Sequence, residues 1–275
     1  MSLLPDFVGV GAQRCATSWV SNCLNEHPDV YVPPEKELHF FNVHYARGID
    51  WYVEQFREGH GFRLRGEYSP GYFASEEAIS RMSEHVPHAK ILVMLRDPLD
   101  RAESAYRLYR SSGRIQSRSF SDALSEHGFL VEYGRYAARL RMLLDKFPRE
   151  QVLVHLFEDV QSDPLATIGG TYEWLGVDPS FVPPSVGKPA NLSLAPWIQN
   201  RLNQSAVMRA VADSKAGTLA KRAFQGIRNA RRRRSRTVTP RGDQAARKLI
   251  REALHKDTRE LSAMLGRDLS TWSTF

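Results

Sequence analysis

Short, mostly apolar runs alternate with longer amphipathic segments along most of this chain. The clearest apolar runs are Phe7–Val10, Lys90–Leu95 and Gln151–Phe157. Runs of this length are typical of strands buried on both faces, as in a parallel sheet. Helical spacing of apolar residues follows at 75–85, 99–109, 134–147 and 163–175. This alternation predicts an α/β fold: three α/β/α layers, a central, mostly parallel sheet and further C-terminal helices.

Weaker patterns supply the remaining elements. We expect a short strand within 25–34, a strand at 63–69, helices at 48–56 and 119–130, and helix caps at Ser75 and Asp163. Beyond them we expect a proline-rich loop over 181–196, helices at 197–226 and 242–265, and a docked tail containing Trp272 and Phe275. No internal repeat is visible, and we expect residues 1–275 to form a single domain.

The first strand runs into a loop of small and polar residues, GAQRCATS at 11–18, before helical spacing begins at Trp19. The first N–H groups of a helix have no partner, and the helix dipole adds positive potential there. Arg14 contributes a full charge, while Thr17 and Ser18 can cap the helix or donate hydroxyls. The loop predicts a site for a phosphate-like anion; an ordinary strand-turn-helix corner is the alternative.

This loop differs from a nucleoside triphosphate loop where the chemistry depends on it. A Walker loop ends in Gly-Lys-Ser/Thr, whereas these places hold Ala16, Thr17 and Ser18. The cation comes earlier, at Arg14. The pattern therefore argues against ATP or GTP hydrolysis and favours another anionic group held by a related, P-loop-like architecture.

A second cationic corner follows the apolar run at 90–95. Arg96 stands at the end of that predicted strand, where open α/β sheets bind ligands. Ser104 lies two turns along the next helix, so the two side chains could hold a second anionic group. The alternative is a local salt bridge from Arg96 to Asp97 or Asp100.

Charged side chains and aromatic rings adjoin in EKELHFFN at 35–42. Glu37 and His39 are held against an apolar wall there, where pKa values shift and proton transfer becomes possible. A half-exposed turn whose Phe40 and Phe41 fill the core is the simpler interpretation, and composition alone favours it.

Charge and cysteine content narrow the function classes. The net charge is +7, but residues 221–251 carry 12 Lys and Arg against one acid, so the rest of the chain is acidic. The basic segment 228–236 has no interleaved aromatic residues for base stacking, which favours a solvated, flexible loop at 228–241 over nucleic-acid binding.

The two cysteines, Cys15 and Cys23, are too far apart on one helix to form a disulfide. The lack of a structural disulfide is typical of a protein in a reducing compartment.

Membrane and export signals are absent from the pattern. No apolar run approaches the ~20 residues needed to span a bilayer. The first residues have neither a basic region nor a long apolar core, so we expect a cytoplasmic protein without stable membrane insertion.

With both corners in view, the sequence resembles the PAPS-dependent sulfotransferases, and within them the branch of heparan sulfate and other carbohydrate sulfotransferases. The resemblance rests on GAQRCATSW at 11–19, KELHFFN at 36–42, GIDWY at 48–52, GEYSPGYF at 66–73, LRDPLDRAESAY at 95–106, GRYAARL at 134–140 and LGRDLSTW at 265–272. Each piece is modest, but their order and spacing together are specific.

The resemblance implies a donor, PAPS (3′-phosphoadenosine 5′-phosphosulfate), and a product, PAP (3′-phosphoadenosine 5′-phosphate). We expect no metal, because cations and amides already serve the anion and no cluster of Cys and His ligands is visible. The resemblance assigns the 5′-phosphosulfate to Arg14, Cys15, Ala16, Thr17, Ser18 and Trp19. Arg96 and Ser104 would hold the 3′-phosphate, with Tyr136 and Lys188 as further donor contacts. Glu37 falls at the position of the catalytic base, with His39 two residues on and Arg14 stabilising charge. The acceptor hydroxyl or amine stays open: a glycan, a lipid, a polyketide or another small metabolite.

The departures from the family pattern are specific. The loop cation is usually Lys and is Arg14 here, and the usual Gly before Thr17 is Ala16. The carbohydrate branch often has Lys where this chain has Tyr68, which weakens any transfer of glycan specificity. A P-loop kinase and a nucleic-acid-binding protein acting through 228–236 are the alternative functions.

Overall fold

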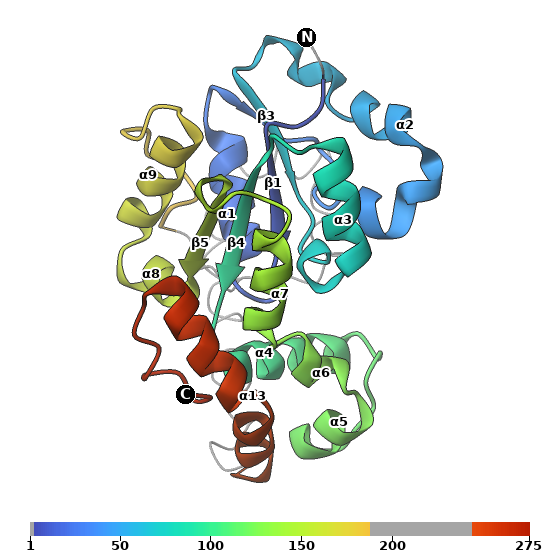
Figure 1. Ribbon diagram of the computed structural model, residues 1–275, viewed down its shortest axis with the longest axis vertical. Coiled ribbons are helices and arrows are strands. Elements are labelled where there is room, and N and C mark those ends of the chain that lie inside the picture. Colours follow the sequence, from blue (N-terminus) through green and yellow to red (C-terminus); the bar gives the residue numbers. More distant parts are fainter. Residues whose placement is uncertain (1–2, 188–243) are drawn as a thin grey trace, which may run out of the picture. The chain divides into compact units, whose positions relative to one another are not determined.

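The computed structural model describes residues 3–187 and 244–275 and contains a five-stranded parallel sheet (Figure 1). The strand order is β2-β3-β1-β4-β5, and every pairing is parallel. The strands are β1 Phe7–Gly11, β2 Val30–Tyr31, β3 Leu64–Tyr68, β4 Lys90–Leu95 and β5 Val152–Leu156. Helices flank the sheet, so the predicted three-layer α/β fold is confirmed.

The helices and short helical turns occupy the connections between strands. The α-helices are α1 Thr17–Glu26, α2 Ile49–Glu54, α3 Glu76–His85, α4 Pro98–Ser111, α5 Phe120–Glu126, α6 Phe129–Glu132, α7 Tyr136–Leu144, α8 Phe157–Ser162, α9 Pro164–Leu175 and α13 Gln244–Leu265. The short turns are the π-helical η1 Phe40–His44 and the 3-10 turns η2 Tyr45–Arg47, η3 Arg57–Gly61, η4 Tyr72–Ala74 and η5 Arg149–Gln151.

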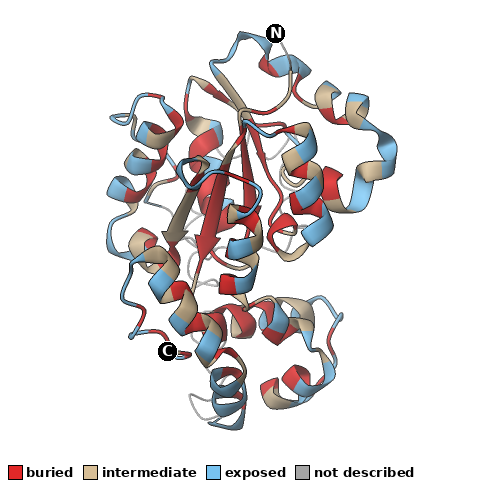
Figure 2. Ribbon diagram, in the orientation of Figure 1, coloured by how far each residue is buried: buried red, intermediate tan, exposed pale blue. Residues whose placement is uncertain are grey.

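The apolar runs become the centre of the sheet, as the pattern predicts. All of β1 is buried, and only the first residue of β4 is not (Figure 2). The outer strand β5 is half-buried along its middle. A second apolar cluster joins α4, α5, α6 and α13, with Leu99, Tyr106 and Ile250 among its members. This cluster fixes α4, the helix that carries Ser104, against the rest of the domain.

The N-terminal caps of α3 and α9 are the predicted residues, whereas the cap of α1 is not. The Ser75 hydroxyl accepts from the Ala78 N–H at 3.1 Å, and the Asp163 carboxylate accepts from the Ala166 N–H at 2.9 Å. At α1 neither Thr17 nor Ser18 is the cap. Ala16 occupies that position with a left-handed backbone (φ 68°) and no side-chain capping bond. The N–H groups at the start of α1 are therefore not satisfied by a capping side chain.

Two further expectations need correction, and three others lie outside the described residues. The helix predicted over 119–130 is broken into α5 and α6 at His127, whose backbone leaves the helical region (φ −128°, ψ 77°), and α8 begins at Phe157, where the pattern predicts no helix. The predicted helices at 197–226, the basic loop 228–241 and Lys188 lie outside the described residues.

By internal contacts the chain divides into residues 1–190 with 245–275, and residues 191–244. The sheet belongs to the first unit, and the single-domain expectation stays a prediction. None of the described helices is long and apolar enough to cross a membrane.

Candidate active site

Two polar loops leave the carboxyl ends of neighbouring central strands. Strand β1 pairs with β4, with Gly11 opposite Val93, so the loop after Gly11 starts beside the end of β4. The Ala12 N–H donates to the Met94 carbonyl at 2.6 Å, which ties the start of the loop to β4. This edge of the sheet is where open α/β folds bind their ligands.

The two predicted anion corners meet at Arg14. Its Nε donates to the Ser104 hydroxyl at 3.1 Å, although the two residues are 90 positions apart. Burial lowers the pKa of Arg14, and the positive charge of Arg96 lowers it further. The two guanidinium groups therefore act on one electrostatic region, and an anion there would offset the cost of holding both charges near each other.

Arg96 forms the expected local ion pair with Asp100, and one of its N–H donors is buried without a partner in the described part of the chain. Its Nη2 lies 3.1 Å from the Asp100 carboxylate, and its guanidinium lies 4.5 Å from the centre of the Phe157 ring. The side chain is 12% exposed, and its Nε is buried with no hydrogen-bond partner among the described residues. A buried guanidinium N–H without a partner fits a site that receives an anion.

The loop itself presents backbone N–H groups at the start of α1. Arg14 and Ala16 both have left-handed backbones, with φ values of 73° and 68°. Such conformations recur in concave N–H nests that bind anions. Thr17 is buried and Ser18 is exposed at the same end of the helix. Together with Arg14, this end of α1 can hold one phosphate-like group.

Lys36, which was not predicted as a site residue, links this loop to the Glu37 segment. Its Nζ donates to the Ser18 hydroxyl at 2.6 Å and lies 3.6 Å from the Glu37 carboxylate. The carboxylate therefore lies beside the anion loop. The signal available in the sequence was the cation directly before Glu37 in the EKELHFFN segment.

Glu37 and His39 form a pair. The His39 Nε2 and Glu37 Oε2 atoms are 3.2 Å apart. Burial raises the pKa of Glu37, but the hydrogen bond with His39 and the charge of Lys36 outweigh burial and bring it below the ordinary value. The same hydrogen bond raises the pKa of His39. The arrangement favours an ionised carboxylate beside a protonated imidazole.

Three other predicted donor contacts have buried side chains beneath the loop. Cys15, Trp19 and Tyr136 are 0%, 4% and 0% exposed. The Cys15 sulfur lies 3.8 Å from the Tyr136 hydroxyl, and the Trp19 Nε1 donates to the Val186 carbonyl at 3.3 Å. Burial raises the pKa of Cys15 to about 11, so its thiol stays protonated at neutral pH. These side chains support the loop. Cys15 and Cys23 are both buried and form no disulfide, as expected.

Tyr68, at the position where the carbohydrate branch often has Lys, is buried rather than directed to an acceptor. Its hydroxyl donates to the Gly11 carbonyl at 3.3 Å. A Cβ atom at Gly9 would lie 2.1 Å from the Tyr68 ring, so only glycine allows this packing. The cation of the carbohydrate branch is therefore absent at this point, while Lys36 contributes a positive charge from another segment.

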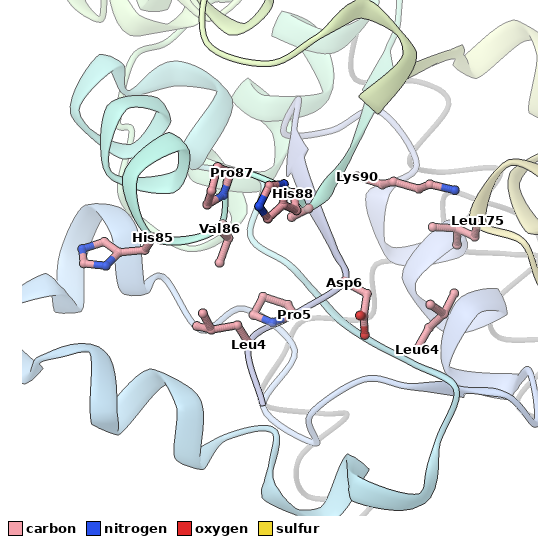
Figure 3. Close-up of a pocket in the computed structure, with 11 residues that line it drawn as sticks. Leu4, Pro5, Asp6, Leu64, His85, Val86, Pro87, His88, Lys90 and Leu175 are labelled. Carbon is pink, nitrogen blue, oxygen red and sulfur yellow. The ribbon is translucent and has the colours of Figure 1, made fainter. Parts of the chain in front are cut away.

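A hollow of about 370 Å³ lies at the opposite edge of the sheet (Figure 3). It is lined at the amino ends of the strands by Asp6, Leu64 and Lys90, together with His85 and His88. Lys90 donates to the Trp174 carbonyl, and Asp6 pairs with Arg65, so both charges are already satisfied. Among residues 3–187 and 244–275, no three His, Cys, Asp or Glu side chains gather in a set that could hold a metal ion.

The fold and the site define an α/β protein with a P-loop-like anion loop and a second cationic corner on the adjacent strand. The family model for the sulfotransferase domain matches residues 4–228. The chain belongs to the sulfotransferase family, which confirms the resemblance found in its motifs.

Curated relatives support the same family. Bifunctional heparan sulfate N-deacetylase/N-sulfotransferase 3 of Homo sapiens is 34% identical over 199 residues, which are 65% of this chain and 23% of that protein. Heparan sulfate glucosamine 3-O-sulfotransferase 3B1 of Homo sapiens is 29% identical over 182 residues, 63% of this chain and 46% of that protein. The chain thus spans less than half the length of these relatives.

Solved structures agree in fold. A sulfotransferase from Alicyclobacillus acidocaldarius matches with a TM-score of 0.73 and 28% identity, covering 98% of each chain. The sulfotransferase domain of the Synechococcus PCC 7002 olefin synthase matches with a TM-score of 0.54 at 18% identity and shares the fold.

Proposed function

We propose that this chain transfers the sulfuryl group from PAPS to a hydroxyl or amine of an acceptor. The observation that carries the proposal is the position of Arg14 and Arg96 at the ends of adjacent strands, where the charge of one lowers the pKa of the other. Two cationic groups in one region suit an adenosine with anionic groups on both its 3′ and 5′ positions. Membership of the sulfotransferase family supports this donor.

Each corner has a separate role in holding the donor. The N–H groups at the start of α1 and the Arg14 guanidinium would bind the 5′-phosphosulfate. Arg96, with its buried Nε, would bind the 3′-phosphate beside Ser104. Since Ser104 accepts from Arg14 at 3.1 Å, one hydroxyl touches both corners. Lys188, the remaining predicted donor contact, lies outside the described residues and stays a prediction.

Glu37 is the group placed to accept the acceptor's proton. Its carboxylate is ionised at neutral pH, because His39 and Lys36 outweigh the effect of burial on its pKa. As the acceptor oxygen or nitrogen bonds to sulfur, the bond between sulfur and the bridging oxygen breaks and the proton passes to Glu37. Arg14 and the loop N–H groups stabilise the charge that develops on the departing phosphate oxygen. His39 keeps the carboxylate oriented and ionised.

The named relatives act on heparan sulfate, as their names state, and this makes a glycan one candidate acceptor. Tyr68 is buried at the position where the carbohydrate branch often has Lys, so this chain lacks that cation of the branch. We therefore propose a hydroxyl- or amine-bearing acceptor without assigning a glycan. A panel of acceptors assayed with sulfur-labelled donor would identify the class.

A nucleotide stability test separates this function from its alternatives. PAP at about 100 times its Kd is expected to raise the melting temperature by roughly 5–10 °C, because a ligand bound only to the folded state stabilises it by ~2.7 kcal/mol. ATP, which lacks a 3′-phosphate, should raise it by much less. A larger shift with ATP would favour a P-loop kinase, and no shift with either nucleotide would contradict the proposed donor. Deletion of 228–236 should leave the shift with PAP intact if this segment does not bind the donor.

A further inference from the structure

A buried carboxyl outside the proposed chemistry lies behind the Glu37–His39 pair. Glu67, on β3, is 1% exposed. Its Oε1 accepts from the Tyr72 hydroxyl at 2.7 Å and the Tyr52 hydroxyl at 3.2 Å, and its Oε2 accepts from the Ser69 hydroxyl at 2.6 Å. These donors come from η4, from α2 and from just after β3, so the fold brings separate segments onto one carboxyl.

Two of these hydroxyls also hold the backbone of the turn that carries His39. The Ser69 hydroxyl accepts from the His39 N–H at 3.0 Å. The Tyr72 hydroxyl accepts from the Phe41 N–H at 3.4 Å. His39 itself has a left-handed backbone (φ 49°), a conformation that needs support from its surroundings. Both chains of hydrogen bonds therefore run from this turn through a hydroxyl to Glu67.

The direction of these hydrogen bonds depends on the charge of Glu67. An ionised carboxylate accepts only, so all three hydroxyls can donate to it while Ser69 and Tyr72 accept from the turn. A protonated Glu67 carboxyl must itself donate to the oxygen of one of the three hydroxyls. That hydroxyl can then no longer donate to Glu67, so its own hydrogen is left without an acceptor. Ionised Glu67 thus matches the observed network, and a neutral one disrupts it.

We propose that Glu67 is a positioning residue: its carboxylate fixes the His39–Phe41 turn through Ser69 and Tyr72, and thereby the imidazole that faces Glu37. The inference rests on the proposed function, since it concerns the pair that would accept the acceptor's proton. Glu67 itself touches neither donor nor acceptor in this scheme.

Electrostatics connect Glu67 to the pH dependence of the pair. Burial raises the pKa of Glu67 to about 7, against the opposing hydrogen bonds from Ser69, Tyr72 and Tyr52. The pKa of His39 is raised first by its bond with Glu37 and also by the charge of Glu67. The titratable groups facing Glu67 are Tyr52 of α2, Tyr72 of η4 and His39; Arg81 of α3 donates to the Phe41 carbonyl of the same turn. Loss of the Glu67 charge should then lower the pKa of His39.

Glu67→Gln tests the inference, because the amide resembles the protonated carboxyl and cannot ionise. We expect kcat to fall roughly 10- to 100-fold at pH 8, since a small displacement of a reacting group costs about this much. PAP should bind as before. The wild-type kcat should decrease as the pH falls through about 7, and this decrease should be missing in the variant. The His39 imidazole pKa, followed by NMR, should be lower in the variant.

Tyr52→Phe is the matched control, because it removes one donor to the same carboxylate but neither link to the turn. It should keep nearly the wild-type kcat well above pH 7, while the fall in kcat moves to higher pH, because the lost Tyr52 hydroxyl no longer lowers the pKa of Glu67. An unchanged His39 titration and pH profile in Glu67→Gln would overturn the inference, as would an equal loss of kcat in Tyr52→Phe. If Glu67→Gln does not fold, Ser69→Ala tests the inference instead, because this substitution removes the link to the His39 N–H. An unchanged kcat in Ser69→Ala would also overturn the inference. The NMR titration needs no donor, so its result is separate from whether PAPS is used at all.

Discussion

Replacing Glu37 with glutamine is expected to lower turnover roughly 10²- to 10⁴-fold while PAP binding stays within about twofold of the wild type. Glutamine has the same shape and can still accept the hydrogen bond from His39, now 3.2 Å from the carboxylate. It cannot take a proton from the acceptor. The measurement is kcat with labelled PAPS, together with calorimetric titration of PAP.

Glu35→Gln provides the control for this prediction. Glu35 is an exposed carboxylate two residues away in the same segment, so its loss changes the local charge equally without touching the Glu37–His39 pair. We expect nearly wild-type turnover. If Glu37→Gln loses PAP affinity with its fold intact, Glu37 acts in donor binding and the base must be sought elsewhere.

The sequence predicted the sheet well because its signals are local and strong. The run at 90–95 is bounded by Ala89 and Arg96 and is buried apart from its first residue, so its limits could be read directly. Helix α9 likewise begins with a capping Asp163 and Pro164 and ends at Gly176, which has a φ of 90°. By contrast, the only local sign of a break within 119–130 is Gly128, a residue that helices tolerate at a modest cost, and the chain leaves the helical region at His127, just before it.

The two anion-binding corners could be predicted from the sequence, whereas the buried hydrogen-bond cluster around Glu67 could not. Arg14 and Arg96 each follow an apolar run, so their place at one edge of the sheet follows from parallel strands. Glu67 lies in the segment 63–69, in which every second residue is polar. Because Arg65 and Glu67 lie on the same side of a strand with this alternation, the pattern predicts that Glu67 is exposed. Its burial depends on Tyr52 and Tyr72, which reach it from other elements. Such a cluster is a product of tertiary packing and has no signature in sequence spacing.

Replacing Arg96 with glutamine is expected to weaken PAP roughly 10- to 100-fold but to leave adenosine 5′-phosphate almost unaffected. The two nucleotides differ only in the 3′-phosphate, and a hydrogen bond to a charged group contributes about 1.5–3 kcal/mol. Arg14→Gln should weaken both nucleotides, because Arg14 lies in the loop at the start of α1, where the 5′ group would bind. Calorimetric titration of the two nucleotides against each variant makes the comparison.

Arg57→Gln controls for the loss of a guanidinium, because Arg57 is 75% exposed and pairs with Glu54. It should bind both nucleotides as the wild type does. Equal weakening of both nucleotides by Arg96→Gln would move Arg96 away from the 3′-phosphate. If Arg96→Gln binds both nucleotides as tightly as the wild type, the two-anion site itself is contradicted. Arg96 would then only stabilise α4 through its ion pair with Asp100, 3.1 Å away. The difference between the nucleotides thus separates a binding role for Arg96 from its ion pair.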